Sequence, residues 1–333
     1  MPKVLILHTG GTLGMRGEPL QPDAFSTALV DKVPQLEELA DLEVRIVFNL
    51  DSSDMGPRQW EHLADQIHEA RAEFDGFVIV HGTDTMAYTA SALSFALLGL
   101  QRPIILTGAQ RPLAAHRTDA RRNLVDAVEL ATRGFSGVGI CFDGLLLQGV
   151  KATKSNVHDY RAFASPGVEP WARMGVDVAI DESLIGQRKA YRFRPRFRPA
   201  VVSIQVTPGM PPGPVLDHLR ADQGVEGVVI GAYGLGTVPT EEPDLATSTA
   251  RLVERGVDVL VVTQSSGHIE LEKYENSRAL AKAGVIPGGS MTIEAGVTKL
   301  MHGLAHFPDR RERRAYLMAD TAGERGGRGG SAH

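Results

Sequence analysis

Threonines follow short apolar runs at several places in this chain, and a hydroxyl placed there can act as a nucleophile or bind a ligand. Thr9-Gly10-Gly11-Thr12 follows the apolar run 4–7. Paired glycines let a backbone turn sharply and approach a ligand closely, and the threonines offer hydroxyls beside exposed N–H groups. A phosphate-binding loop is the competing interpretation, but neither the P-loop spacing nor a full dinucleotide-binding fingerprint is present.

Similar loops recur further along. Asp51-Ser52-Ser53-Asp54 and His81-Gly82-Thr83-Asp84-Thr85 each precede a predicted helix, so these residues could simply cap it. Capping and ligand binding are compatible, because backbone donors and hydroxyls at a helix start suit a carboxylate. A fourth loop, Thr107-Gly108-Ala109-Gln110, follows the next apolar run. Hydroxyls and carboxylates recur after successive strands, and one common site explains this recurrence better than a set of unrelated helix caps.

A base for such a threonine could come from Lys151-Ala152-Thr153-Lys154. Lysines in loops are usually solvated, so composition gives neither lysine a role. A threonine hydroxyl is a poor nucleophile until a neighbouring base takes its proton, and a lysine of lowered pKa, steadied by an aspartate, can serve. The sequence therefore contains the side chains that a threonine-based reaction needs.

The loops require a sheet that brings them to one edge. Short apolar runs alternate with stretches of helical periodicity, which predicts a mostly parallel sheet with helices on both faces. Ligands bind such sheets beyond the carboxyl ends of the strands. The predicted strands are 4–8, 44–48, 77–81, 104–107, 138–142, 201–206, 228–232 and 259–263, and the predicted helices are 59–72, 86–98, 119–132, 244–255 and 291–304.

The length of 333 residues suits two α/β domains. We predict a larger N-terminal catalytic domain at 1–186 and a smaller Rossmann- or flavodoxin-like domain at 200–322. The linker between them, 187–199, alternates arginines with other residues, which is more typical of a solvated extended crossing than of a nucleic-acid-binding run. The end of the chain, 323–333, is rich in glycine and arginine and is predicted to be disordered.

Composition excludes several classes of protein. A net charge of −5 without a basic stripe argues against nucleic acid or an anionic membrane surface as the main partner. The single cysteine, Cys141, excludes an intramolecular disulfide and any multi-cysteine metal site, and its apolar surroundings predict a buried thiol. No segment approaches the apolar length of a membrane span. We expect a cytoplasmic protein with neither metal nor cofactor.

The chain resembles the bacterial-type L-asparaginases, in their cytoplasmic type I branch. The resemblance covers nearly the full length. It implies a two-domain α/β fold, a homodimer or dimer of dimers, and hydrolysis of L-asparagine to aspartate and ammonia. The motifs that carry it are Thr9-Gly10-Gly11-Thr12, His81-Gly82-Thr83-Asp84-Thr85-Met86, Gly108-Ala109-Gln110-Arg111-Pro112 and Thr153-Lys154, with the later stretches 231–239 and 284–300.

The resemblance also implies roles for individual residues. Thr12 matches the nucleophile of a mobile loop, and Thr83 matches a second catalytic threonine with Lys154 as its base and Asp84 as the accompanying carboxylate. For the substrate, the matching contacts are Asp84 to the α-amino group, Ser52 to the α-carboxylate, the main chain of Ala109 to the amide, and Ser53 as a second polar contact.

Two positions depart from the family pattern. The tyrosine that usually orients the nucleophile is absent between Thr12 and Val44, where Leu20 or a neighbour falls near its place. Thr237 stands where relatives often carry an asparagine that reaches a neighbouring subunit, so we expect an altered contact there. Glu294 is a further candidate for such a contact, although a helix-surface glutamate is an equal alternative. Thr153 matches a stretch where type I relatives bind asparagine as a regulator.

Several alternatives stay open at this point. The reaction could pass through an ester on Thr12 or through direct attack of water activated at Thr83. Glutamine could replace asparagine as substrate. The ammonia-releasing component of the archaeal glutamyl-tRNA amidotransferase shares the motifs, but it has an extra domain before the first loop, which here starts at residue 9, and the acidic charge does not suit tRNA. A non-catalytic amino-acid sensor is a rival from another class, although a pure binder has no need of Lys154.

Overall fold

The computed structural model describes residues 1–16, 21–22, 32–185, 189–240 and 244–326. By internal contacts the chain divides into two compact units, Met1–Pro195 and Arg196–His333. The division falls within the predicted linker 187–199. Each unit is an α/β layer structure, in agreement with the predicted fold class.

The first unit is built on an eight-stranded sheet in the order β12-β11-β8-β7-β6-β5-β1-β4. Strands β4, β1, β5, β6 and β7 run parallel, whereas β8, β11 and β12 continue the sheet with antiparallel pairings. The strands are β1 (Lys3–Gly10), β4 (Asp41–Leu50), β5 (Gly76–Val80), β6 (Pro103–Thr107), β7 (Gly137–Phe142), β8 (Leu145–Gln148), β11 (Ala172–Met174) and β12 (Val178–Ile180).

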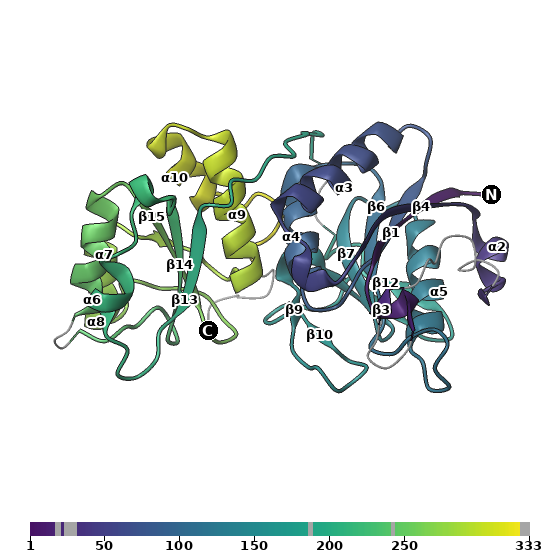
Figure 1. The fold of residues 1–333 in the computed structure, drawn as a ribbon, viewed down its shortest axis with the longest axis horizontal. Helices are drawn as coiled ribbons and strands as arrows, with labels where there is room; N and C mark the ends of the chain where they lie inside the picture. Colours follow the sequence, from purple (N-terminus) through teal and green to yellow (C-terminus); the bar gives the residue numbers. More distant parts are fainter. Residues whose placement is uncertain (17–20, 23–31, 186–188, 241–243, 327–333) are drawn as a thin grey trace. The chain divides into compact units, whose positions relative to one another are not determined.

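Helices cover both faces of this sheet, with α3 and α4 on one side and α2 and α5 on the other (Figure 1). The residues of β5 and β6 are accordingly buried throughout, as is typical of parallel strands covered on both faces. The helices are α2 (Gln35–Leu39), α3 (Pro57–Ala70), α4 (Met86–Ala96) and α5 (Ala120–Ala131), and two small strand pairs join β2 (Met15–Arg16) to β3 (Gln21–Pro22) and β9 (Thr153–Lys154) to β10 (Phe163–Ala164).

The strand order reverses direction at β1, and this reversal positions the loops of interest. After β1 the chain adds β4 on one side and then β5 on the other. The loops that leave β1 and β5 therefore diverge at a topological switch point, which is where open α/β sheets bind ligands. The predicted convergence of the first loops at one sheet edge follows from this topology.

The second unit has a parallel sheet in the order β13-β14-β15-β16. Helices α6, α7 and α8 lie on one face and α9 and α10 on the other (Figure 1). Helix α10 was not predicted, because only one of its two buried side chains, Leu317, is apolar, and the other is Arg313, which pairs with Asp258 at 2.5 Å. The elements are β13 (Val201–Gln205), α6 (Pro212–Leu216), β14 (Gly227–Ala232), α7 (Leu245–Glu254), β15 (Asp258–Thr263), α8 (Glu275–Lys282), β16 (Ile286–Pro287), α9 (Ile293–His306) and α10 (Arg310–Met318).

The described part of the linker is extended, as predicted, but it is not simply solvated. The hydroxyl of Tyr191 lies 2.7 Å from Nδ1 of His68 on α3, and the ring of Phe193 stacks on the same imidazole at 3.8 Å. The N–H groups of Arg192 and Arg194 donate to carbonyls of α4 and the residues after it. The aromatic side chains between the arginines therefore attach this segment to the first unit.

The prediction of disorder for 323–333 is wrong as far as residue 326. The chain folds back after α10, and the side chain of Glu324 is fully buried, 0% exposed. It forms an ion pair with Lys299 of α9, which is also 0% exposed. Composition misled the prediction because glycine and arginine are typical of disordered tails, whereas one paired carboxylate suffices to anchor this segment. Residues 327–333 lie outside the described residues.

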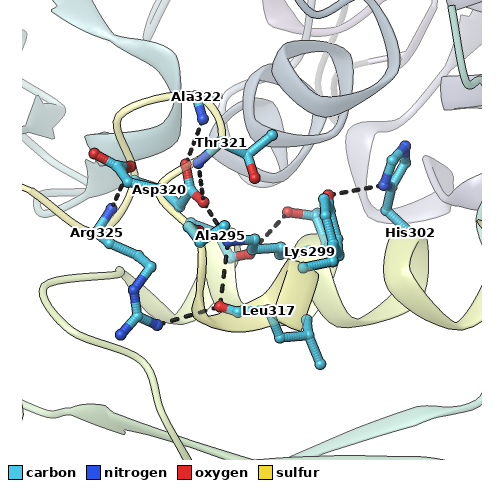
Figure 2. A network of polar contacts seen from close by, with 12 residues as sticks. Ala295, Lys299, His302, Leu317, Asp320, Thr321, Ala322 and Arg325 are labelled. Carbon is cyan, nitrogen blue, oxygen red and sulfur yellow. Dashed lines mark hydrogen bonds and ion pairs between the residues drawn. The ribbon is translucent and has the colours of Figure 1, made fainter. Parts of the chain in front are cut away.

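Backbone groups complete the surroundings of this ion pair (Figure 2). The Lys299 ammonium also donates to the carbonyl of Leu317 at 3.3 Å. The Glu324 carboxylate accepts the N–H groups of Thr321 at 3.0 Å and Ala322 at 2.6 Å. Buried charges are tolerated only when they are paired and hydrogen-bonded in this way.

We expect Glu324→Gln to destabilise the protein by about 3–5 kcal/mol, because the substitution leaves the Lys299 ammonium buried without its counter-ion. The measurement is the thermal midpoint followed by circular dichroism at neutral pH. Glu312→Gln, the same chemical change on an exposed residue of α10, is the matched control and should change stability by less than about 0.5 kcal/mol. Equal midpoints for the two variants would contradict the prediction.

A second stability prediction concerns Asp126 on α5. Burial raises the pKa of its carboxyl from the usual 3.8 to about 6, and Oδ2 has no hydrogen-bond partner among the described residues, with Arg122 Nε 3.6 Å away. A raised folded-state pKa favours the folded protein at low pH and loses this contribution as the pH rises through about 6. The shift corresponds to about 3 kcal/mol at most.

We therefore expect Asp126→Asn to stabilise the protein at pH 8, by about 1–3 kcal/mol, and to leave stability nearly unchanged at pH 4. Denaturant midpoints of wild type and variant between pH 4 and 8 measure the difference. Glu129→Gln, on the same helix but ion-paired to Arg133, is the matched control and should not stabilise the protein at pH 8. An Asp126→Asn protein less stable than wild type at pH 8 would refute the expectation.

Candidate functional site

The loop after β1 packs its backbone against the third loop and the end of β4. Gly10, the last residue of β1, and Gly11 have φ of 114° and 86°, in the region that favours glycine. A Cβ on Gly11 would lie 2.5 Å from the N of Gly82, and a Cβ on Gly10 would lie 2.2 Å from the O of Leu50. The paired glycines therefore let the first loop lie directly on its neighbours. Thr12, which begins a short 3-10 turn (Thr12–Gly14), is half-buried beside them.

Ser52 joins the same cluster from the loop after β4. Its hydroxyl would lie 2.6 Å from a Cβ on Gly82, and its carbonyl accepts a hydrogen bond from the Thr85 hydroxyl at 2.6 Å. The side chain of Asp51 accepts from the N–H of Ser53 at 2.8 Å and begins a 3-10 turn, Ser52–Asp54. Ser52 is buried at 4% exposure, whereas Ser53 is exposed. The predicted cap therefore exists, and it also fixes Ser52 beside the third loop.

The centre of the site is a lysine that contacts both a threonine and an aspartate. Lys154 Nζ donates to Thr83 Oγ1 at 2.8 Å and to Asp84 Oδ1 at 2.5 Å. Thr83 is buried, Lys154 is largely buried, and the Asp84 carboxylate is 65% exposed. Lys154 reaches this position from β9, which pairs with β10. A hydroxyl held by a lysine next to a carboxylate is the arrangement that hydroxyl-dependent hydrolases use to move a proton.

A chain of hydrogen bonds supports the peptide that precedes Thr83. His81 Nδ1 lies 2.6 Å from the Gly82 carbonyl, so Nδ1 carries the proton, and Nε2 accepts from the Thr89 hydroxyl at 2.9 Å. Trp60 Nε1 donates in turn to Thr89 Oγ1 at 3.0 Å. Burial lowers the pKa of His81 to about 4. The imidazole is therefore neutral at physiological pH and orients the loop. This role was not predicted from the sequence, although a histidine directly before a Gly-Thr pair is a signal for it.

His8, near the end of β1, has a similar character. Burial lowers the pKa of its imidazole to about 4, and its Nδ1 lies 3.2 Å from the N–H of Gly10. With Nδ1 as the acceptor, the neutral ring supports the turn that leads to Thr12. Neither buried histidine is therefore charged at neutral pH.

The fourth loop lies against the third. Ala109 is buried at 1% exposure, and a Cβ on Gly108 would lie 2.3 Å from the carbonyl of His81. The structure thus groups the predicted residues of the first unit around one edge of the sheet. Thr83, Asp84 and Lys154 are in direct contact, and the others join through backbone packing: Thr12, Ser52 and Ala109.

The remaining predicted residues have separate positions. Thr153 is half-buried beside Lys154 on β9. Thr237 and Glu294 belong to the second unit. Thr237 forms an isolated β-bridge with Tyr233, and Glu294 is buried at 6% exposure in the first turn of α9. The alternative of a helix-surface glutamate is therefore wrong.

Within the described ranges, no group of three or more His, Cys, Asp or Glu side chains could hold a metal ion. Among the helices in those ranges, none is long and apolar enough to cross a bilayer. Cys141 is buried, as predicted, and burial raises the pKa of its thiol.

The fold and the site together define a two-unit α/β hydrolase with threonine hydroxyls at the sheet's switch point. Comparison with family models matches residues 3–185 to the N-terminal asparaginase domain and residues 200–317 to the glutaminase/asparaginase C-terminal domain. These matches cover most of the chain, and the chain belongs to the asparaginase family.

Individual relatives agree with this assignment. The solved structure of the thermostable L-asparaginase from Thermococcus kodakarensis is 35% identical, with a TM-score of 0.88 over 98% of this chain and 99% of its own. L-asparaginase 1 of Escherichia coli K12 is 34% identical over 96% of this chain and 97% of its own. A glutamyl-tRNA(Gln) amidotransferase component from Pyrococcus abyssi is also 34% identical, over 97% of this chain but 77% of its own.

Proposed function

We propose that this chain hydrolyses the side-chain amide of L-asparagine to L-aspartate and ammonia. The observation that carries the proposal is the double contact of Lys154 Nζ, 2.8 Å from Thr83 Oγ1 and 2.5 Å from Asp84 Oδ1. It provides a proton relay beside a second threonine, Thr12. Relatives named L-asparaginase that match nearly the full length of this chain support the substrate.

In the proposed reaction the Thr12 hydroxyl attacks the amide carbon and loses its proton towards Thr83 and Lys154. Backbone N–H groups near both threonines stabilise the oxyanion of the tetrahedral intermediate. The relay returns the proton to the leaving nitrogen, ammonia departs, and an ester remains on Thr12. Water then attacks this ester, which releases aspartate and restores the Thr12 hydroxyl.

The substrate is held by groups that the fold places around this relay. We assign Asp84 to the α-amino group, Ser52 to the α-carboxylate, and the main chain of Ala109 to the amide, with Ser53 as a further contact. The exposed Asp84 carboxylate and the buried Ser52 hydroxyl suit these roles. We also propose a cytoplasmic homo-oligomer, a dimer or dimer of dimers. Thr237 and Glu294 are the candidates for contacts to a neighbouring subunit's site. Thr153 is the candidate for a regulatory contact to asparagine.

The test is ammonia release from L-asparagine and L-glutamine across a concentration series. We expect turnover of asparagine with a kcat/KM about 10–200-fold above that of glutamine, because one methylene in a pocket discriminates by about 1–3 kcal/mol. A sigmoidal rate curve would support regulation by asparagine. Preference for glutamine would overturn the substrate assignment. Asparagine binding in calorimetry without ammonia release would favour the amino-acid sensor instead.

A further inference from the structure

The loop 108–113 is held at its end by the buried side chain of Leu113. At its start Gly108 and Ala109 have little side-chain volume to pack, so hydrogen bonds to the backbone fix this part of the loop. The first of these come from Asp119, just before α5. Its carboxylate accepts the N–H of Gln110 at 3.1 and 2.9 Å, one distance for each oxygen, and the N–H of Arg111 at 3.0 Å.

Asn123, one turn further along α5, holds the other end of the same turn. Its Nδ2 donates to the Gly108 carbonyl at 3.0 Å and to Oδ2 of Asp119 at 3.1 Å. Its Oδ1 accepts the N–H of Asp143, in the turn between β7 and β8, at 3.1 Å. Asn123 is buried at 1% exposure. Such a buried, satisfied network fixes one geometry and loses much of its energy when a member is removed.

The same loop touches both catalytic threonine loops. At its start, Gly108 lies against the His81 carbonyl, two residues before Thr83. At its end, the N–H of Leu113 donates to the carbonyl of Leu13 at 3.2 Å, directly after Thr12. No tyrosine lies between Thr12 and Val44, and this backbone bond supports the turn that Thr12 begins.

We infer that Asp119 and Asn123 are positioning residues for the reaction, which set the loop 108–113 and through it the Ala109 main chain and the Thr12 turn. The inference rests on the proposed function, in which Ala109 contacts the amide that is cleaved. Neither Asp119 nor Asn123 has a hydrogen bond to Asp84 or Ser52 among the described residues. Their loss should therefore disturb the reacting amide more than the binding of the α-amino and α-carboxylate groups.

The principal test is the steady-state kinetics of Asp119→Ala with asparagine. We expect kcat to fall by about 100-fold while KM changes by less than about threefold, because a displacement of about 1 Å at the reacting groups costs this much in rate. Asp119→Asn keeps one acceptor oxygen and should retain an intermediate kcat. Glu129→Gln, a carboxylate-to-amide change further along α5, should behave as wild type.

Hydrogen exchange provides a second measurement that does not depend on turnover. In Asp119→Asn the N–H groups of Gln110, Arg111 and Leu113, which donate the hydrogen bonds of the loop, should exchange at least about tenfold faster than in wild type, while those of α5 should not. A wild-type protein that releases no ammonia would refute the proposed function. Faster loop exchange in Asp119→Asn would then still show that Asp119 holds the loop 108–113. Unchanged kcat or unchanged loop exchange in the folded Asp119 variants would overturn the positioning role.

Discussion

Lys154→Met is expected to lower kcat for asparagine hydrolysis by about 10³-fold or more. Methionine keeps the unbranched stem of the side chain but lacks the ammonium, so it cannot donate to Thr83 Oγ1 or pair with Asp84, the two contacts that Lys154 makes at 2.8 and 2.5 Å. General acid–base catalysis contributes about 10²–10⁴-fold, and Thr83 depends on this amine for its proton transfer. Steady-state ammonia release measures the effect.

Two further variants show whether the fall in kcat comes from the loss of the Lys154 amine. Lys154→Arg retains a positive charge beside Asp84, but a guanidinium does not release its proton, so we expect nearly the same loss of kcat. Lys282→Met, the same change on an exposed residue of α8, should leave kcat unaltered. Asparagine should still bind the Lys154→Met protein in calorimetry, because Ser52 and Asp84 remain. A Lys154→Met enzyme with more than a tenth of the wild-type kcat would remove Lys154 from the relay.

Much of the first unit could be predicted because its strands are hydrophobic and buried on both faces. The run Val4–Leu7 is 0% exposed, and such a continuous apolar segment between loops is a strong strand signal. The antiparallel strands β8, β11 and β12 were missed because each has four residues or fewer. The chain reverses into β8 through a tight turn at Asp143-Gly144, where φ is 47° and 72°. Two positive φ angles in succession are typical of a β-hairpin turn.

The candidate site, too, could be predicted only in part. Threonines after glycines at strand ends could be recognised, since their positions follow from the parallel topology alone. The supporting contacts could not, because they join residues far apart in sequence. Trp60 reaches Thr89, and Leu113 reaches Leu13, through contacts that only the packed layers create. Sequence patterns therefore predicted candidate reacting groups, and the structure added the contacts that hold them.

Charge was the least reliable guide in the second unit. Arg313 and Glu324 occur in segments whose composition is typical of solvated or disordered chain, yet both are buried in ion pairs, with Asp258 and Lys299 respectively. A buried charge is stable only with a partner, and neither partner is a sequence neighbour. The pairing that makes these segments ordered was therefore invisible before the fold was known.

Thr12→Ala is expected to lower kcat by about 10³-fold or more and to abolish any covalent intermediate. The sequence has no tyrosine between Thr12 and Val44, and the turn that Thr12 begins is held by Gly11 packed against Gly82 and by the Leu113 bond to Leu13. Loss of a nucleophile removes the ester route altogether. Thr12→Ser, which keeps the hydroxyl, should retain measurable turnover, and Thr247→Ala on the exposed surface of α7 should match wild type.

Acid quenching during turnover, followed by mass spectrometry of the peptide that contains Thr12, separates the two chemical routes. An aspartyl ester on Thr12 in wild type, absent from Thr12→Ala, supports nucleophilic attack by this hydroxyl. A Thr12→Ala protein with nearly full turnover would instead assign the chemistry to water activated at Thr83, and Thr83→Ala should then be the more damaging substitution. Because Thr83 keeps its contact to Lys154 in the Thr12→Ala protein, the turnover of that variant decides whether the Thr12 hydroxyl or a water molecule forms the bond.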